Sequence, residues 1–328
     1  MRRVACKAAC GIVKSMVRIE HLAADLVLID TLYRDTPDAI GAYLLLGERP
    51  ALIEVGPAST VDTLLAGVRA AGLEPDDLRA VAVTHIHLDH AGATGTLVHR
   101  LPHLEVYVHH VGAPHLVDPS RLLASAARLY GDDLTALFGE VRPVPAERVH
   151  SLEDGDEVHL GARRLVAVDT PGHARHHHAY FDAASGDLFA GDAAGVALPG
   201  SRYVRPPTPP PELDVDAWER TLARLGALGA RRLLLTHFGP HTWVNELLDQ
   251  MRARMRAAVA LVRAGVDAGE RDEQICERLR ALADAALAAT DGPGAAGRYE
   301  VIMATQQSAL GLIRYVNRKG RGASAPPC

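Results

Sequence analysis

Short apolar runs recur along the chain, and four of them lead directly into histidine or acidic residues. These runs, at Ala80–Val83, Leu165–Val168, Leu188–Ala190 and Leu233–Leu235, have the length and composition of short buried strands. The polar residues that follow them are His85, His87, Asp89, His90, His173, Asp192 and His237. Because α/β folds place their chemistry at strand ends, we expect these side chains to meet at one edge of the fold.

The rest of the pattern predicts a mixed domain followed by helices. Further strands are expected at Leu26–Asp30, Tyr43–Leu46, Ala51–Val55 and Val106–Val108. Helices are expected from Ser59 or Thr60 to about Ala71, and over His90–Arg100, Asp216–Leu228, Asn245–Ala264, Asp272–Ala289 and Tyr299–Asn317. We therefore expect a catalytic domain over residues 16–241 with a helical insertion at 114–145, and a helical region over 242–318. The ends, residues 1–15 and 319–328, are expected to be disordered.

The segment His85-Ile-His87-Leu-Asp89-His90 predicts a metal site. Its spacing does not fit one face of a helix, but it fits a turn whose side chains converge on a point. Imidazole and carboxylate ligands suit zinc, iron or manganese rather than calcium. A closed structural zinc site would use mostly thiolates, and no cysteine lies near any of the motifs. The pattern therefore favours a catalytic metal site.

With these motifs in this order, residues 17–241 resemble the metallo-β-lactamase superfamily, in its glyoxalase II-like hydrolase branch. The resemblance implies an α/β fold, a four-layer αββα sandwich, here with a C-terminal helical appendage that shapes the substrate entrance or a homodimer contact. It also implies two divalent metal ions, zinc first, with iron and manganese as alternatives. His85, His87 and His173 would hold the first ion, and Asp89, His90 and His237 the second. Asp192 would bridge both, so that Asp89 and Asp192 are the expected catalytic carboxylates.

Several residues are candidates for supporting roles. Glu54 stands where members of the superfamily commonly carry an Asp that orients a ligand. His177 matches the second His of the pattern Thr-Pro-Gly-His-x-x-Gly-His, although Arg175 and His176 replace the residues between. One of His176, His178 and His241 is expected to reach the site. Tyr203, Arg202 and Arg205, in the Pro-rich loop Pro199–Pro211, are candidate substrate contacts or part of a solvated loop face, and Tyr130 has the same standing.

Composition restricts the partners. The 328 residues carry a net charge of −5 and a pI near 6.4, which argues against nucleic acid as a partner. The four cysteines form no plausible disulfide framework, and residues 1–15 lack the apolar region of an export signal, so we expect a cytoplasmic protein. No run approaches 18 apolar residues, and we expect no membrane association.

The leading hypothesis is a dinuclear metallohydrolase that acts on a small ester, thioester or lactone. The alternative is an oxidoreductase like the mono-iron persulfide dioxygenases, which keep the same His-rich motif. That branch carries a Gly-Arg-Thr-Asp signature, and the sequence after Asp192 lacks it. Lactonase relatives have a Tyr shortly after the bridging Asp, whereas this chain has Gly195 three residues on. The substrate therefore stays open.

Overall fold

Two β-sheets packed face to face form the centre of the protein. The computed structural model describes residues 17–291 and 296–323. The first sheet follows the order of the chain: β1 (Arg18–Ala23), β2 (Leu26–Asp30), β3 (Gly41–Leu45), β4 (Ala51–Ile53), β5 (Ala80–Ala82), β6 (Glu105–His109) and β7 (Val149–Leu152). The second has the order β13 (Gly239–His241), β12 (Arg232–Leu235), β11 (Asp187–Gly191), β10 (His178–Asp182), β9 (Arg163–Asp169) and β8 (Glu157–Leu160). Strands β4 to β7 pair in parallel, as do β11 and β12.

The main core lies between the sheets. Tyr43 of the first sheet packs edge-on against Phe189 of the second, with ring centroids 5.4 Å apart. The Tyr43 hydroxyl donates a hydrogen bond to the carbonyl of Leu235 at 2.6 Å, which fixes the sheets to each other. Each sheet is covered by the other sheet on its inner face and by helices on its outer face. Both faces of the strands are therefore buried, which explains why their sequences are continuous apolar runs.

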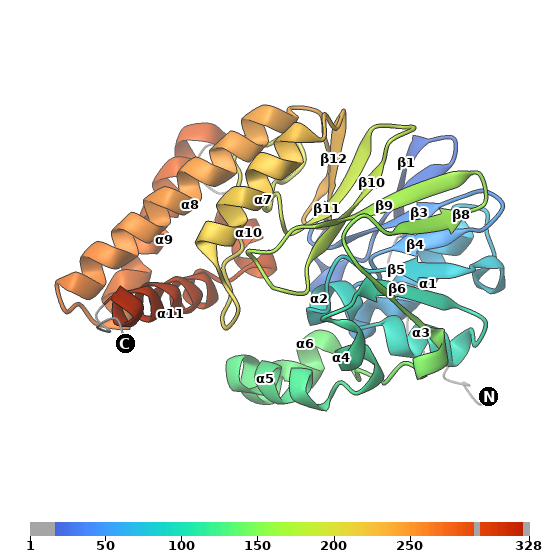
Figure 1. Ribbon diagram of the computed structural model, residues 1–328, viewed down its shortest axis with the longest axis horizontal. Helices are drawn as coiled ribbons and strands as arrows, with labels where there is room; N and C mark the ends of the chain where they lie inside the picture. The colour runs from blue at the N-terminus through green and yellow to red at the C-terminus, as the bar shows by residue number, and fades with distance from the viewer. Residues whose placement is uncertain (1–16, 292–295, 324–328) are drawn as a thin grey trace, which may run out of the picture.

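Helices cover both outer faces (Figure 1). The helices of the first half are α1 (Val61–Ala70), α2 (Leu88–Ala91), α3 (Thr94–Arg100), α4 (Ala113–Val117), α5 (Ser120–Tyr130) and α6 (Leu134–Phe138). Those of the second half are α7 (Val215–Ala227), α8 (Val244–Asp267), α9 (Asp272–Asp291), α10 (Ala296–Ile302) and α11 (Thr305–Ala323). Helices α1 and α3 pack on the first sheet, and α7, α8, α9 and α11 share a core with the second. The predicted four-layer αββα sandwich with C-terminal helices is confirmed.

The helices of the insertion lie where they are expected, whereas the last predicted helix differs from the structure. Helices α4, α5 and α6 occupy the insertion expected at 114–145. The single helix predicted over Tyr299–Asn317 is instead two helices, α10 and α11, which are separated at Met303 and Ala304. The Glu300 carboxylate accepts a hydrogen bond from the backbone N–H of Thr305, so it satisfies a donor at the start of α11.

At the chain ends, α11 runs to Ala323, so the expected disordered tail is helical over residues 319–323. The leader expected at 1–15 lies outside the described residues. Among the helices that the structure describes, none has both the length and the apolar character needed to cross a bilayer.

Candidate metal centre

Every predicted ligand lies just beyond the end of a strand. His85, His87, Asp89 and His90 follow β5, and Asp89 and His90 are already in α2. His173 follows β9, Asp192 follows β11, and His237 follows β12. The residues of these four segments meet at one edge of the sandwich. Most of their side chains are buried, with His85, His90, His173, Asp192 and His237 each no more than 1% exposed. The side chain of Asp89 is 22% exposed, so the group is open on that side.

One group consists of His85, His87 and His173. His87 Nδ1 lies 3.0 Å from His85 Nε2 and 2.8 Å from His173 Nε2. Ligands of a tetrahedral zinc ion with bonds of ~2.0–2.1 Å stand roughly 3.3 Å apart, so these separations suit three ligands of one ion. This group could hold a metal ion.

A second group consists of Asp89, His90 and His237. His237 Nε2 lies 3.3 Å from His90 Nε2 and 3.4 Å from Asp89 Oδ2. Asp192 lies between the two groups. Its Oδ2 is 3.2 Å from His173 Nε2, and its Oδ1 is 3.4 Å from His90 Nε2 and 3.5 Å from His237 Nε2. Each carboxylate oxygen of Asp192 therefore faces a different group, as a bridging ligand requires.

The outward nitrogens of these imidazoles are held by hydrogen bonds, which leave the inward nitrogens facing the centre. His173 Nδ1 donates to the carbonyl of Pro207 at 2.9 Å, and His237 Nδ1 donates to that of Ala39 at 2.8 Å. His90 Nδ1 donates to Glu54 Oε1 at 3.2 Å. In the neutral form, which is the form that binds metal, each of these imidazoles has its one N–H on the outward nitrogen, so its inward Nε2 carries a lone pair. Lone pairs facing one another at about 3 Å repel unless a cation lies between them, so this donor set fits metal ions.

Electrostatics points the same way. Burial would raise the pKa of Asp192, but His90, His173 and His237 outweigh it and hold the pKa well below its usual value. Burial would lower the pKa of His90, yet Asp192, Asp89 and Glu54 raise it well above the usual value. Burial, reinforced by neighbouring imidazoles, lowers the pKa values of His85 and His87. The carboxylates therefore favour positive charge at this position, and bound cations would provide it.

Glu54 and His177 support the centre without facing it. Glu54, at a φ of 64°, accepts hydrogen bonds from Thr84 and His90, and Thr84 in turn accepts one from His85 Nδ1 at 3.0 Å. Although Glu54, His85 and His90 lie close enough together to suggest a third metal group, Glu54 contacts the Nδ1 atom of His90, which points away from the other ligands. This is the supporting position expected for Glu54.

His177 holds the backbone of Asp192. Its Nε2 accepts a hydrogen bond from the Asp192 N–H at 3.1 Å, and its Nδ1 donates to Thr170 Oγ1 at 2.6 Å. Both ring nitrogens are thus used, so His177 positions the centre rather than ligating metal. The neighbouring Gly191 has a φ of 50°, and a Cβ there would stand 2.5 Å from Thr84 Oγ1 and 2.7 Å from His177 Nε2. Only glycine fits at this close approach.

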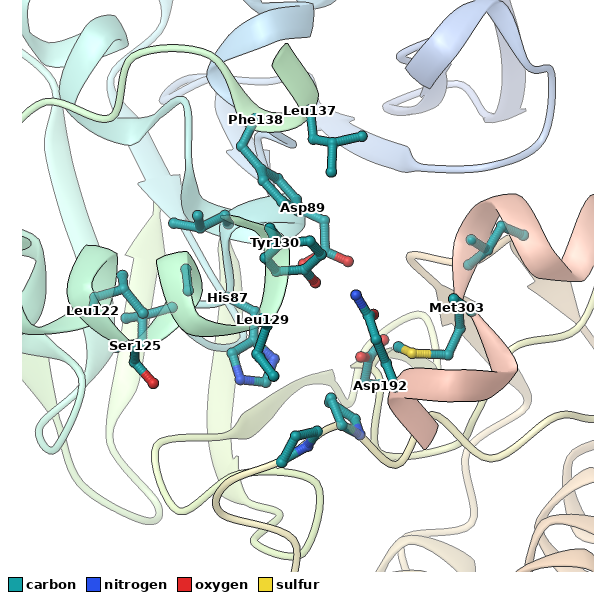
Figure 2. A pocket seen from close by; sticks show the side chains of 18 of the residues that line it. His87, Asp89, Leu122, Ser125, Leu129, Tyr130, Leu137, Phe138, Asp192 and Met303 are labelled. Atoms are coloured by element: carbon teal, nitrogen blue, oxygen red, sulfur yellow. The ribbon is translucent and has the colours of Figure 1, made fainter. Parts of the chain in front are cut away.

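A cavity of about 440 Å³ opens on the exposed side of the centre. Its floor includes His87, Asp89 and Asp192, and its walls come from two distant parts of the chain. Figure 2 shows Leu122 and Ser125 on one side of these residues and Met303 on the other. The first wall belongs to α5 and α6, and the second to the turn between α10 and α11. Pro209, Pro210 and Pro211 line it as well.

The predicted substrate contacts in the Pro-rich loop need correction. Tyr203 is buried against Tyr299 and lies under Arg254, while Arg205 pairs with Glu300 at 2.8 Å. Arg202 pairs with Glu246 at 3.1 Å. None of Arg202, Tyr203 and Arg205 lines the cavity at the centre. The reason is that residues 196 and 205 pair through two backbone hydrogen bonds, which turn this part of the loop toward the C-terminal helices.

The structure identifies other cavity residues. Of the three histidines of which one is expected to reach the site, His176 lines the cavity. The imidazoles of His178 and His241 instead form hydrogen bonds with backbone carbonyls. Tyr130 lines it too, together with Tyr33, which the sequence pattern did not single out. Burial and Asp89 raise the pKa of both phenols, so they are protonated near neutral pH. No local sequence signal identifies Tyr33 or Met303, because each lies in a turn that becomes part of the cavity wall only when the chain folds.

Comparison with known proteins agrees with this geometry. The family model described as the metallo-beta-lactamase superfamily matches residues 25–237. The metallo-beta-lactamase fold-containing protein ST1585 of Sulfurisphaera tokodaii is 27% identical over 252 residues, covering 75% of this chain and 91% of that protein. The hydroxyacylglutathione hydrolase of Vibrio cholerae is 30% identical over 116 residues, which are 35% of this chain and 33% of the enzyme. The crystal structure of the metallo-beta-lactamase family protein TTHA1429 from Thermus thermophilus has a TM-score of 0.66 at 23% identity, covering 86% of this chain and 89% of that one.

Proposed function

The chain belongs to the metallo-beta-lactamase superfamily, and we propose that it is a dinuclear metal-dependent hydrolase of a small ester, thioester or lactone. The observation that carries this proposal is the placement of Asp192, with one carboxylate oxygen toward each group of ligands. The second group, Asp89, His90 and His237, is complete, which favours two ions over one. Zinc fits the mixture of imidazole and carboxylate, and iron and manganese would fit it too.

The residues of the chain suit hydrolysis at this position. When bound, the two ions would polarise a carbonyl oxygen and lower the pKa of water from 15.7 toward ~7. Asp192 would keep the two groups at a constant separation. Asp89, on the open side of the centre, would accept a hydrogen bond from the attacking water and orient it. Tyr130, which is protonated and lines the same cavity, would donate a hydrogen bond to substrate oxygen.

Metal analysis combined with an activity screen tests this proposal. The full chain, loaded with zinc and dialysed, should hold two equivalents per chain and hydrolyse members of a panel of esters, thioesters and lactones. Asp192→Asn should lower the metal content at both positions and abolish turnover. A wild-type protein that holds one iron per chain and consumes oxygen with a persulfide substrate would instead establish the dioxygenase alternative.

A further inference from the structure

The two walls of the cavity are largely apolar beside the metal centre. From the insertion come Leu122, Ala126, Leu129, Leu137 and Phe138, and from the other side come Val301, Ile302 and Met303. Leu122, Leu129 and Leu137 are only half-buried, so they keep apolar surface open to the cavity. In Figure 2, Leu122 and Met303 lie on opposite sides of His87 and Asp192. A molecule whose reacting carbon sits at the centre would therefore have apolar surface on both sides.

The charged residues of the cavity are mixed in sign. Arg34 and Arg121 line it together with Asp133, Glu212 and Glu300, so both signs are present. Two of the acids are already engaged, because Glu212 pairs with Arg175 at 2.9 Å and Glu300 with Arg205 at 2.8 Å. Recognition is left mainly to the apolar walls, where removing hydrocarbon from water is favourable.

The packing explains why these walls stay apart. Phe138 and Ala126 are buried with Leu88 in a small core of their own, and the Phe138 ring packs edge-on against Tyr130 at 4.8 Å. On the other side, Tyr299 of α10 donates a hydrogen bond to the carbonyl of Tyr203 at 3.1 Å, and Glu300 pairs with Arg205. Each wall is thus fixed from behind, and the cleft between them is preformed.

We propose that this cleft binds a hydrocarbon group of several carbons on the substrate. The protein would then hydrolyse esters, thioesters or lactones of medium-length apolar chains in preference to short or strongly hydrophilic ones. This inference rests on the proposed hydrolase function for its reaction, but it rests on the cavity walls for its specificity.

Kinetics across a chain-length series tests the proposal with the zinc-loaded full chain. The first arm lengthens the acyl group of p-nitrophenyl esters from acetate to octanoate, and the second lengthens the alcohol of acetate esters. We expect one arm to show kcat/KM rising roughly threefold to fourfold per methylene, because burying a methylene is favourable by about 0.8 kcal/mol. The arm that responds identifies which side of the ester bond occupies the cleft. A flat profile in both arms overturns the proposal.

Paired substitutions on one helix connect the effect to the cleft. Leu129→Ser removes a cavity side chain, and it should lower the octanoate-to-acetate ratio of kcat/KM about tenfold. If kcat/KM rises with the length of the alcohol instead, Leu129→Ser should lower the ratio of kcat/KM for the longest to the shortest alcohol about tenfold. Leu123→Ser is the matched control, since Leu123 also lies on α5 but does not line the cavity. Ala304→Phe should narrow the cleft and lower the same ratio. Equal ratios for Leu129→Ser and Leu123→Ser would contradict the proposal.

Direct binding separates this inference from the proposed function. Calorimetry with decanoate should detect binding to the zinc-loaded protein that acetate lacks, and Leu129→Ser should weaken it about tenfold. If decanoate binds in this way but no ester, thioester or lactone is hydrolysed, the hydrolase function fails and the cleft assignment stands. If hydrolysis occurs while decanoate and acetate bind alike, the function stands and the cleft assignment fails.

Discussion

Glu54 offers a sharp test of how the second metal position is supported. Its Oε1 accepts hydrogen bonds from His90 Nδ1 and from Thr84, and the side chain is 1% exposed. Glu54→Gln keeps an acceptor oxygen of nearly the same shape but removes the negative charge that makes His90 a better donor to a cation. We expect metal affinity at the position of Asp89, His90 and His237 to fall 10-fold to 100-fold, or about 1.4–2.7 kcal/mol. His85 reaches Glu54 only through Thr84, so the other position should change less.

Glu54→Ala should behave differently. It leaves the donors of Thr84 and His90 buried without an acceptor, at about 1–3 kcal/mol each, so the free energy of unfolding should fall by roughly 2–6 kcal/mol. A two-step zinc titration against a chromophoric chelator measures affinity, and urea unfolding of the metal-free protein measures stability. Asp182→Asn is a matched control, because Asp182 is a buried carboxylate that pairs with Arg163 away from the centre.

The result that contradicts this reasoning is specific. Zinc affinity in Glu54→Gln equal to wild type at both positions would show that Glu54 does not act through His90. Equal weakening at both positions would show that it acts on the centre as a whole. In the His237→Ala background, whose second position already lacks a ligand, Glu54→Gln should cause little further loss.

Three further predictions concern the same molecule. Tyr130→Phe should lower kcat/KM about tenfold on the best substrate while zinc content per chain, measured by mass spectrometry, stays at the wild-type value, because only a hydrogen-bond donor is removed. His177→Ala should lower zinc affinity, measured by chelator competition, because the N–H of Asp192 loses its acceptor; an unchanged affinity would show that the Asp192 backbone holds its position alone. Burial lowers the pKa of His178 to about 3, so the folded protein keeps this imidazole neutral, whereas in the unfolded chain its pKa is 6.5. The neutral, buried ring therefore stabilises the fold above pH 6.5, and this stabilisation is lost as the pH falls toward 3. Between pH 7 and pH 5 the metal-free wild type should therefore lose about 2 kcal/mol more unfolding free energy in urea titrations than His178→Gln.

The sequence predicted the residues of the centre because each one follows an apolar run. A buried strand has a recognisable composition, and the side chains after its end are held by that strand, so His85, His173, Asp192 and His237 were placed by local pattern alone. Glu54 is different, because it falls inside the strand expected at Ala51–Val55 and is a candidate only through the resemblance to the superfamily; in the structure it directly follows β4. What local pattern cannot specify is which atoms converge, and the split of the Asp192 oxygens between the two groups appears only in the folded chain.

The cavity walls were harder to predict for physical reasons. Tyr203 and Arg205 follow the strand of Asp192 closely, but the pairing of residues 196 and 205 turns them away, and no short-range signal encodes that long hairpin. The helical period continues across Met303, so the break that brings this residue to the cavity was hidden. At this break the Glu300 side chain accepts a hydrogen bond from the Thr305 N–H and so satisfies a donor at the start of α11.

On the proposed function, chemistry and specificity would reside in different parts of this chain. The residues of the centre lie within the span that the family model matches, and they are held by strand ends and backbone carbonyls. One wall of the cavity comes from α5 and α6, away from the strand ends, and the other lies beyond the matched span, at residues 301–304. Substitutions at Asp192 or His237 should consequently depress all substrates by one common factor, whereas substitutions at Leu129 or Met303 should change the ratio between substrates. A Met303→Ser variant that lowered every substrate equally would show that the wall supports the centre itself rather than selecting what enters it.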